Sequence, residues 1–205
     1  QLADAIKKNN IYSEQDTRIN CKLCQELLPT EIDFEKHCIG YKFCTKCNHI
    51  NGIYQDSINF ASHIYADAGG SNYSNFYIDK KYEERLHHIY TPKVNFLLDH
   101  IDLVKPTHYD FGCGLGHLVN AARCKGIDSF GGDVGELLIK AGNDSLEHFH
   151  NIRSLEVLDI NTSLDYISTI SKDVLSMMAV IEHISDLNSF FKNIRNASFK
   201  YFYYS

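Results

Sequence analysis

The stretch Asp110–Gly116, with the sequence D-F-G-C-G-L-G, sets three glycines at alternate positions before a segment of helical periodicity. Because glycine has no Cβ and tolerates positive φ, the pattern predicts a tight strand-to-helix turn whose backbone approaches a ligand. Unpaired N–H groups and a partial positive charge at the helix start suit a nucleotide-like or carboxylate-bearing ligand. The alternative interpretation is an ordinary turn without a ligand.

The spacing of the glycines indicates which ligand. A dinucleotide-binding loop needs G-x-G-x-x-G, but here Gly116 comes one residue early and His117 stands where the third glycine should be. The pattern D-x-G-x-G-x-G instead resembles the first motif of class I S-adenosylmethionine-dependent methyltransferases. The resemblance implies that the turn approaches the methyl donor and that its leading acid orients the donor's amino-acid end. These donor-binding candidates are Asp110, Gly112, Cys113, Gly114 and Gly116.

A second acid follows about 20 residues later, where a Rossmann-like fold places a carboxylate for ribose hydroxyls. Residues 129–134 are expected to form a strand that ends in Asp133 and Val134. A carboxylate can accept hydrogen bonds from two hydroxyls at once, which explains the residue type. We therefore take Asp133 and Val134 as donor-binding candidates, with a simple turn aspartate as the alternative.

A third strand is expected at 155–159. In the methyltransferases that the glycine turn resembles, residues after this strand flank the adenine. The resemblance therefore makes Asp159 and Ile160 candidates. A helix-capping role for Asp159 is an equal alternative.

The near-continuous apolar run 173–180 is typical of a central parallel strand buried on both faces, and it leads into Glu182 and His183. Ligands of such sheets bind beyond the carboxyl ends of the strands. The pair resembles the Glu-His of many small-molecule methyltransferases, and His183 can take a proton near neutral pH. We take His183 as a candidate base. Glu182 either bonds the imidazole or points into the donor pocket, and a purely structural histidine is the alternative.

Five strands alternating with helices predict an α/β fold, a Rossmann-like, doubly wound parallel sheet. The further strands are expected at 107–111 and 199–204, and the helices start with one that Thr91 caps and Pro92 opens. Another helix is expected over 186–197, capped by Ser185 or Asp186. The resemblance implies the strand order 3-2-1-4-5. The family normally adds an antiparallel strand pair, which we do not find here.

Four cysteines near the start follow the pattern C-x2-C-x19-C-x2-C, which indicates a zinc ribbon. Two knuckles would supply four thiolates, so the zinc should be structural and its coordination closed. Chance spacing of core cysteines is the alternative, and His37, Cys38 and His49 are spare ligands nearby. The expected metal ligands are Cys21, Cys24, Cys44 and Cys47.

The chain is expected to divide into a zinc-ribbon domain with a leader (1–52), an aromatic-rich segment (53–91) and a donor-binding domain (92–205). The leader has a weak helical pattern through Leu2, Ile6 and Ile11. The aromatic segment, with a turn at 69–71, is either a linker that packs on the main domain or a substrate lid. Its aromatic residues include Tyr54, Phe60, Tyr65, Tyr73, Phe76, Tyr77, Tyr82 and Tyr90.

A cysteine-paired ribbon, a tyrosine-rich segment and this glycine motif together resemble methyltransferases of nucleotide-linked deoxysugars and related glycans. We therefore expect an S-adenosylmethionine-dependent enzyme of carbohydrate biosynthesis. Its partner would be a small molecule, a sugar nucleotide or glycan unit, with S-adenosylmethionine and zinc as cofactors. The alternatives are a zinc-ribbon RNA methyltransferase and a non-catalytic zinc-ribbon module with a degenerate methyltransferase fold.

The composition bears on these alternatives. The net charge of −6 argues against a nucleic-acid partner, which usually selects a basic face. The sequence has no run of 18 apolar residues, so it predicts no membrane span. Gln1–Asp4 lacks the pattern of a signal peptide. Seven cysteines without a secretory signal favour a metal site or reduced thiols, hence a cytoplasmic protein. Because the chain begins without Met and ends inside an expected strand, we expect a fragment or a trimmed chain.

Overall fold

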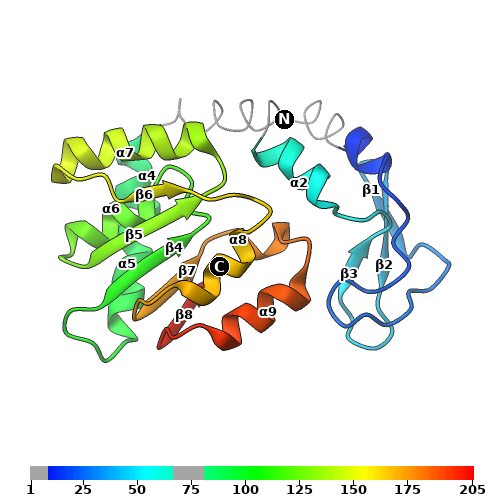
Figure 1. Cartoon of the computed structure of the whole chain (residues 1–205). Helices are drawn as coiled ribbons and strands as arrows, with labels where there is room; N and C mark the ends of the chain where they lie inside the picture. The colour runs from blue at the N-terminus through cyan, green and yellow to red at the C-terminus, as the bar shows by residue number, and fades with distance from the viewer. Residues whose placement is uncertain (1–8, 67–80) are drawn as a thin grey trace.

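The computed structural model describes residues 9–66 and 81–205, and it contains a small antiparallel sheet and a larger parallel sheet (Figure 1). Helix α2 (Ile58–Tyr65) lies between them. The small sheet has the order β1-β2-β3. Its strands are β1 (Phe34–Lys36), β2 (Ile39–Phe43) and β3 (Ile50–Gly52). Several expected features lie outside the described residues: the leader positions Leu2 and Ile6, the turn at 69–71, and Tyr73, Phe76 and Tyr77.

The parallel sheet has the order β6-β5-β4-β7-β8, which confirms the expected order 3-2-1-4-5. Three strands are shorter than expected, because the third ends at Val157, the fourth ends at Met177 and the fifth begins at Tyr201. After Met177 the chain turns through Ala179, whose φ is +56°, so the apolar run does not continue as a strand. The strands are β4 (Thr107–Phe111), β5 (Asp128–Asp133), β6 (Leu155–Val157), β7 (Val174–Met177) and β8 (Tyr201–Tyr204).

Helices cover both faces of this sheet because alternate residues of each buried strand point to opposite sides. Tyr109 and Phe111 of β4 pack in one core with Ile167 and Phe190. Val174 of β7 packs on the other face, against α5. The first face carries α8 (Ser163–Tyr166), η2 (Ile167–Thr169) and α9 (Leu187–Asn196). The second carries α5 (Thr91–Asp99), α6 (His117–Cys124) and α7 (Glu136–His150).

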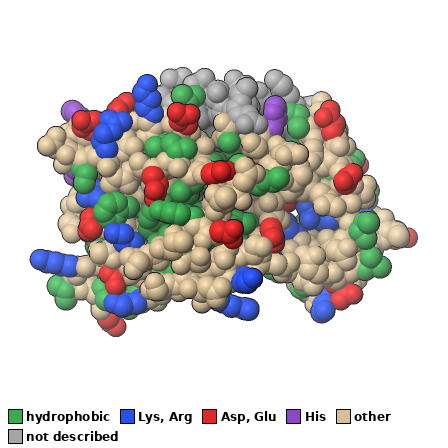
Figure 2. Space-filling model, in the orientation of Figure 1, with side chains coloured by type: hydrophobic (Ala, Val, Ile, Leu, Met, Phe, Trp, Pro, Cys, Tyr) green, Lys and Arg blue, Asp and Glu red, His purple; other side chains and the backbone are tan. Residues whose placement is uncertain are grey.

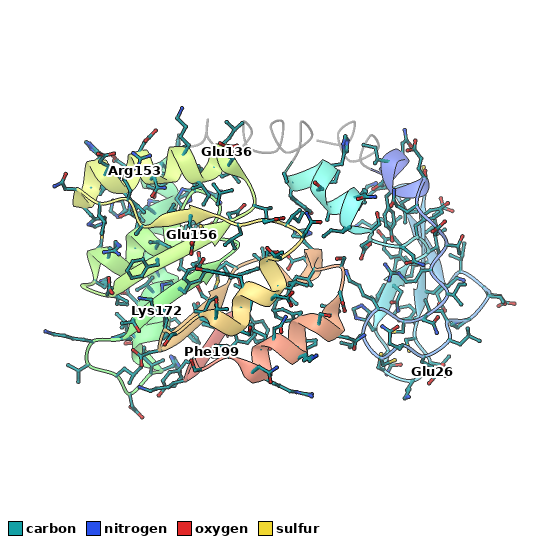
Figure 3. All side chains as sticks on the ribbon, viewed as in Figure 1. Glu26, Glu136, Arg153, Glu156, Lys172 and Phe199 are labelled. Atoms are coloured by element: carbon teal, nitrogen blue, oxygen red, sulfur yellow. The ribbon has the colours of Figure 1, made fainter. Side chains whose placement is uncertain are left out.

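Local hydrogen bonds fix the ends of these layers. Asp186 rather than Ser185 caps α9, because its carboxylate accepts from the N–H groups of Asn188 and Ser189, both at 3.0 Å. Glu156 of β6 accepts hydrogen bonds from the hydroxyls of Tyr109 and Tyr166, at 2.7 and 2.6 Å (Figure 3). This carboxylate therefore ties the edge strand to the central strand and to α8.

A continuous helical run crosses the expected boundary at residue 91. It consists of α4 (Tyr82–Arg85), a π-helical turn η1 (Leu86–Tyr90) and α5. The expectation that Thr91 caps a new helix was therefore wrong: its N–H and its hydroxyl both reach the carbonyl of Leu86, five residues back. In a regular α-helix the ring of Pro92 would clash with the carbonyl four residues earlier. The π turn changes that spacing, so the proline is accommodated inside the helix.

Helix α2 is fastened to the ribbon side of the molecule. Ser57 caps it by accepting from the N–H of Phe60 at 3.1 Å, and the Ser57 hydroxyl donates to Gln15 Oε1 at 2.6 Å. The ring of Tyr12 also contacts the ring of Phe60, with 5.4 Å between centroids. The position of α2 therefore depends on the segment that folds with the ribbon.

One face of the molecule carries mixed charge on its described residues. Basic and acidic side chains are interspersed over the face in Figure 2, without a continuous basic area on its described part. None of the described helices has the length and apolar character that a membrane span requires.

Candidate functional site

A pocket with a cavity volume of about 310 Å³ opens at the carboxyl ends of β4, β5 and β7. This is where ligands of doubly wound sheets bind, because the helices after β4 and β7 diverge to opposite faces. Of the sequence-predicted residues, eight line the pocket, and Gly116, Asp159 and Glu182 do not. Those that line it are Asp110, Gly112, Cys113, Gly114, Asp133, Val134, Ile160 and His183.

The three glycines of the turn have φ values of +73°, +53° and +68°, which L side chains rarely adopt. Their further constraints differ. A Cβ on Gly112 would come within 2.5 Å of Val180, and one on Gly116 within 2.6 Å of Leu155. A Cβ on Gly114 would meet nothing within 4 Å, although Gly114 lines the pocket. Gly112 and Gly116 are thus needed for packing, whereas Gly114 leaves its side of the backbone open to a ligand.

Asp133 links the glycine turn to the next helix. One carboxylate oxygen accepts from the N–H of Gly114 at 2.8 Å and the other from the N–H of Gly135 at 2.8 Å. Burial raises the pKa of Asp133, and these backbone hydrogen bonds oppose the increase. Each oxygen keeps a further lone pair, so the carboxylate can also accept from a ligand's hydroxyls.

Asp110 is only 3% exposed and sits at the base of the pocket. Its Oδ1 accepts from the hydroxyl of Ser176 on the adjacent strand at 2.5 Å. Burial raises the pKa of Asp110 to about 7, and the nearby charge of Asp133 adds to the increase. The Ser176 hydroxyl and Lys93 lower it. A cation placed beside Asp110 would favour its ionised form.

Sequence reasoning did not assign a role to Arg85 or His117, which also line the pocket, as does Tyr90 of the aromatic segment. His117 stacks between Tyr82 and Tyr90, with ring centroids 4.1 and 4.9 Å away. Burial, and then the charge of Arg85, lower the pKa of His117 to about 4, so it is neutral at pH 7. Its buried Nε2 finds no hydrogen-bond partner within the described part of the chain. The signal was present in the sequence, since His117 replaces the glycine of a dinucleotide loop.

The predicted adenine-flanking pair separates in the structure. Ile160 lines the pocket with Leu158 and Val134, so this wall is apolar. Asp159 is exposed, and its carboxylate accepts from the N–H of Asn161 at 2.9 Å. Asp159 therefore forms a turn, and the helix-capping alternative was wrong, because the N-cap of α8 is Thr162.

Glu182 and His183, the predicted catalytic pair, also differ in their placement. Glu182 and His183 lie in a short 3₁₀ turn, η3 (Ile181–His183), after β7. His183 lines the pocket, whereas Glu182 is exposed outside it. Nδ1 of His183 lies 2.9 Å from the hydroxyl of Tyr65 on α2. Ile58 and Ala61 of α2 also line the pocket, so α2 contributes part of its lining.

The pocket has the features that a nucleoside with an amino-acid tail requires. Asp133 can accept from ribose hydroxyls, and an apolar wall faces the space beside it. Gly114 leaves room for close approach, and the buried Nε2 of His117 lacks the partner that a ligand's carboxylate would provide. The residues present therefore fit S-adenosylmethionine.

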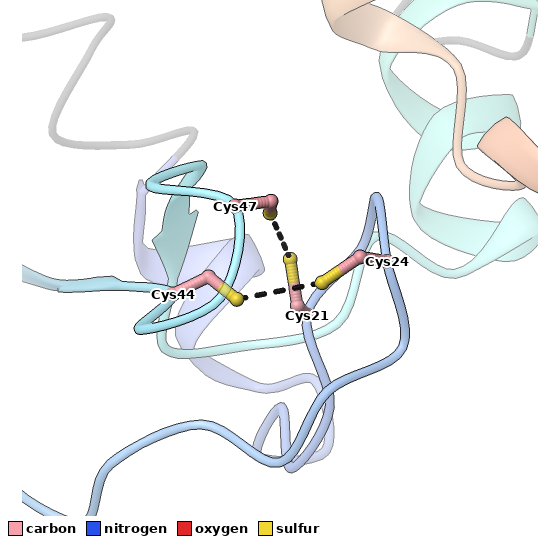
Figure 4. A group of neighbouring side chains, drawn as sticks. All are labelled: Cys21, Cys24, Cys44 and Cys47. Atoms are coloured by element: carbon pink, nitrogen blue, oxygen red, sulfur yellow. Dashed lines mark hydrogen bonds between the residues drawn. The ribbon is translucent and has the colours of Figure 1, made fainter.

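The four predicted metal ligands gather in the ribbon (Figure 4). Their sulfur atoms all lie within 4.8 Å of one another, with Cys21 to Cys47 at 3.6 Å and Cys24 to Cys44 at 3.4 Å. Four thiolates at such separations can surround one tetrahedral ion without leaving a coordination position open. Cys38 is exposed and is not part of this cluster.

The two cysteine pairs have the same backbone geometry. The N–H of Gln25 bonds the carbonyl of Cys21 at 3.0 Å, and the N–H of Asn48 bonds that of Cys44 at 2.9 Å. Gln25 and Asn48 both adopt positive φ, 62° and 58°. Burial raises the pKa of the Cys21 thiol, but backbone N–H groups of the same knuckle lower it to about 7 overall. This favours the thiolate that a metal ion binds.

Comparisons with known proteins bear on the parallel sheet. No family model and no curated protein sequence matches the chain. Solved structures do match, among them magnesium protoporphyrin IX methyltransferase from Synechocystis PCC 6803, with bound SAH (TM-score 0.51) and with bound SAM (TM-score 0.50). These share 14% and 16% identity with this chain, and the matches cover 70% and 72% of it and 69% and 74% of the other chain. The sheet and its helices thus have the Rossmann-like methyltransferase fold.

Proposed function

We propose that this chain is an S-adenosylmethionine-dependent methyltransferase that acts on a small molecule. The observation that carries the proposal is the pocket itself. The open face of Gly114, the carboxylates of Asp110 and Asp133, and the imidazole of His183 all line this one pocket. When bound, S-adenosylmethionine supplies a methyl group that its sulfonium already activates, so the protein has mainly to bind and align.

Each pocket residue then has a role toward the donor. Asp133 holds the ribose hydroxyls, and Val134 and Ile160 flank the adenine. Asp110 orients the amino-acid end through its ammonium group. Arg85 and a neutral His117 bind the carboxylate of the donor's amino-acid end, and this carboxylate is then the hydrogen-bond partner of His117 Nε2.

His183, which also lines the pocket, is the group that removes the acceptor's proton. If its Nδ1–H donates to the Tyr65 oxygen, Nε2 carries the lone pair that can accept this proton. Tyr65 then acts as a positioning residue for the imidazole. Glu182, which is exposed, has no direct role in this scheme.

For the acceptor, we propose a nucleotide-linked sugar or related glycan unit. What supports this class is the order of a cysteine-paired ribbon, a tyrosine-bearing segment and the glycine turn along the chain. The mixed charge of the face in Figure 2 and the net charge of −6 give no reason to prefer RNA. We also propose that the four cysteines hold one structural zinc ion.

A thermal-shift measurement tests the donor site. S-adenosylmethionine and S-adenosylhomocysteine should each raise the melting temperature, by roughly 5–10 °C at 100 times Kd. NAD is the matched control, because it has the same adenosine but needs a different glycine spacing. No shift with either sulfur compound, or an equal shift with NAD, would contradict the proposal.

A further inference from the structure

A chain of buried polar side chains crosses the centre of the parallel sheet and ends at Asp110. His108 is 1% exposed, and Ser129 and Ser176 are fully buried. His108 Nδ1 lies 2.7 Å from the Ser129 hydroxyl, and Nε2 lies 2.7 Å from the Ser176 hydroxyl. The Ser176 hydroxyl in turn donates to Asp110 Oδ1 at 2.5 Å.

The strand register explains why these four residues meet. His108 and Asp110 are two residues apart on β4 and so point to the same face. Ser129 of β5 pairs with His108, and Ser176 of β7 pairs with Asp110. Apolar residues are expected in the middle of a parallel sheet, and an unbonded histidine there would be costly. Here both ring nitrogens have a partner.

The hydrogen bonds also have a direction. Burial lowers the pKa of His108 to about 3, so the ring is neutral and one nitrogen carries the hydrogen. Because the single hydrogen of Ser176 goes to the Asp110 carboxylate, its oxygen must accept from Nε2–H of His108. Nδ1 then accepts from Ser129. When Asp110 is protonated it can donate to Ser176, and the whole chain of hydrogen bonds can reverse with every partner kept.

We propose that Ser129, His108 and Ser176 form a relay that positions the Asp110 carboxylate and stabilises its ionised form for the cationic end of the methyl donor. The relay rests on the proposed function, and it makes Ser176 and His108 positioning residues rather than catalytic ones. Because Asp110 is the member that lines the pocket, donor binding should expel its proton to solvent and set the direction of the whole chain.

The pH dependence of donor binding should follow from the groups around Asp110. Burial and Asp133 raise its pKa to about 7, while Ser176 and Lys93 lower it. Asp110 is therefore expected to exchange its proton near neutral pH, and S-adenosylhomocysteine should release protons on binding in that range. The other titratable groups near it are Asp133 at the end of β5, Lys93 on α5, Cys113 in the glycine turn, His117 on α6, Arg85 on α4 and His183 after β7.

Calorimetry of S-adenosylhomocysteine binding between pH 6 and pH 9, in two buffers of different ionisation enthalpy, tests the relay. Ser176→Ala removes the donor to Asp110 and should lower affinity about 3- to 10-fold at pH 6–7, with the deficit shrinking above pH 8. Ser129→Ala should produce a smaller change of the same form. Ser145→Ala, whose hydroxyl donates to Ala141 of its own helix, is the matched control and should behave as wild type.

The proton release should persist in His183→Ala, which excludes that imidazole as its source. A Ser176→Ala deficit equal at every pH would indicate a structural defect only and overturn the relay. So would the absence of proton release by wild type.

A second measurement needs no variant in the relay to fold. ¹⁵N NMR of wild type should show His108 as the neutral Nε2–H tautomer at pH 8, and a shift toward Nδ1–H as pH falls through 7. An imidazolium, or a tautomer that does not respond to pH, would overturn the relay. If S-adenosylhomocysteine failed to bind, the proposed function would fall, whereas the tautomer of the free protein would still decide the relay.

Discussion

The hydroxyl of Tyr65 lies 2.9 Å from Nδ1 of His183, although 118 residues separate them in sequence. Tyr65 comes from α2, which Ser57 and Gln15 fasten to the ribbon side, and His183 comes from the turn after the fourth parallel strand. One wall of the pocket is therefore shared between two parts of the chain. A side chain of the ribbon-linked segment orients the proposed base.

Replacing the proposed base should separate chemistry from donor binding. His183→Ala should leave the affinity for S-adenosylhomocysteine unchanged and lower the methyl-transfer rate by roughly 10²–10⁴-fold, because the proposed base is lost. Tyr65→Phe should lose less rate and shift the pH–rate profile. Single-turnover kinetics measure the methyl-transfer rate, with nucleotide-linked sugars as the first acceptors to be tried. Glu182→Gln is the control, and near-normal turnover by His183→Ala would remove the imidazole from the chemistry.

Replacing each of two aspartates at neighbouring strand ends should affect the affinity for S-adenosylhomocysteine very differently. Asp133→Ala should weaken S-adenosylhomocysteine binding by roughly 1–3 kcal/mol, because a charge-assisted hydrogen bond to the ligand is lost. Asp159→Ala should leave the affinity within error, since its carboxylate serves the backbone of Asn161. Isothermal calorimetry on the two variants decides it. Equal losses would mean that the carboxylate of Asp133 has no special contact with the ribose.

Alanine substitutions in the glycine turn should distinguish a glycine that leaves room for the donor from one that is needed for packing. Gly114→Ala should reduce donor affinity severely while costing roughly 1–2 kcal/mol of stability, since the new methyl enters open space at positive φ. Gly116→Ala should cost more stability, because its Cβ would lie 2.6 Å from Leu155. Thermal melts and ligand titration of both variants measure the difference. A Gly114→Ala protein that binds S-adenosylhomocysteine normally would show that this side of the turn does not face the donor.

The metal content of the purified protein tests the ribbon. Wild type never exposed to chelator should contain about one zinc per chain, because the four thiolates complete one coordination sphere. Cys21→Ser should lose most of it and destabilise the ribbon. Cys38→Ser, an exposed cysteine outside the cluster, should retain the metal. Less than about half an equivalent in wild type would argue against the site.

Much of this architecture could be predicted because local patterns specify it. The apolar runs indicated the strands, the family that the glycine turn resembles implied their order, and the cysteine spacing identified a cluster that the structure closes. Pro92 led to the wrong prediction of a helix start, because a proline that opens a helix and one accommodated by a π turn look alike in sequence. Although the spacing marks the position of His117, its stacking on Tyr82 and the Tyr65–His183 contact depend on tertiary placement, which local spacing does not encode.

The π turn between α4 and α5 has a consequence for the angular phase of the helix. A π turn holds one more residue than a regular α-helical turn, and each residue of an α-helix advances the chain by about 100°. Deleting one residue within 86–90 would therefore rotate Tyr82 and Arg85 by about that angle relative to α5. Tyr82 would leave the face of His117, and Arg85 would turn away from the pocket that it lines. The length of this turn thus sets the direction in which the preceding helix presents its side chains.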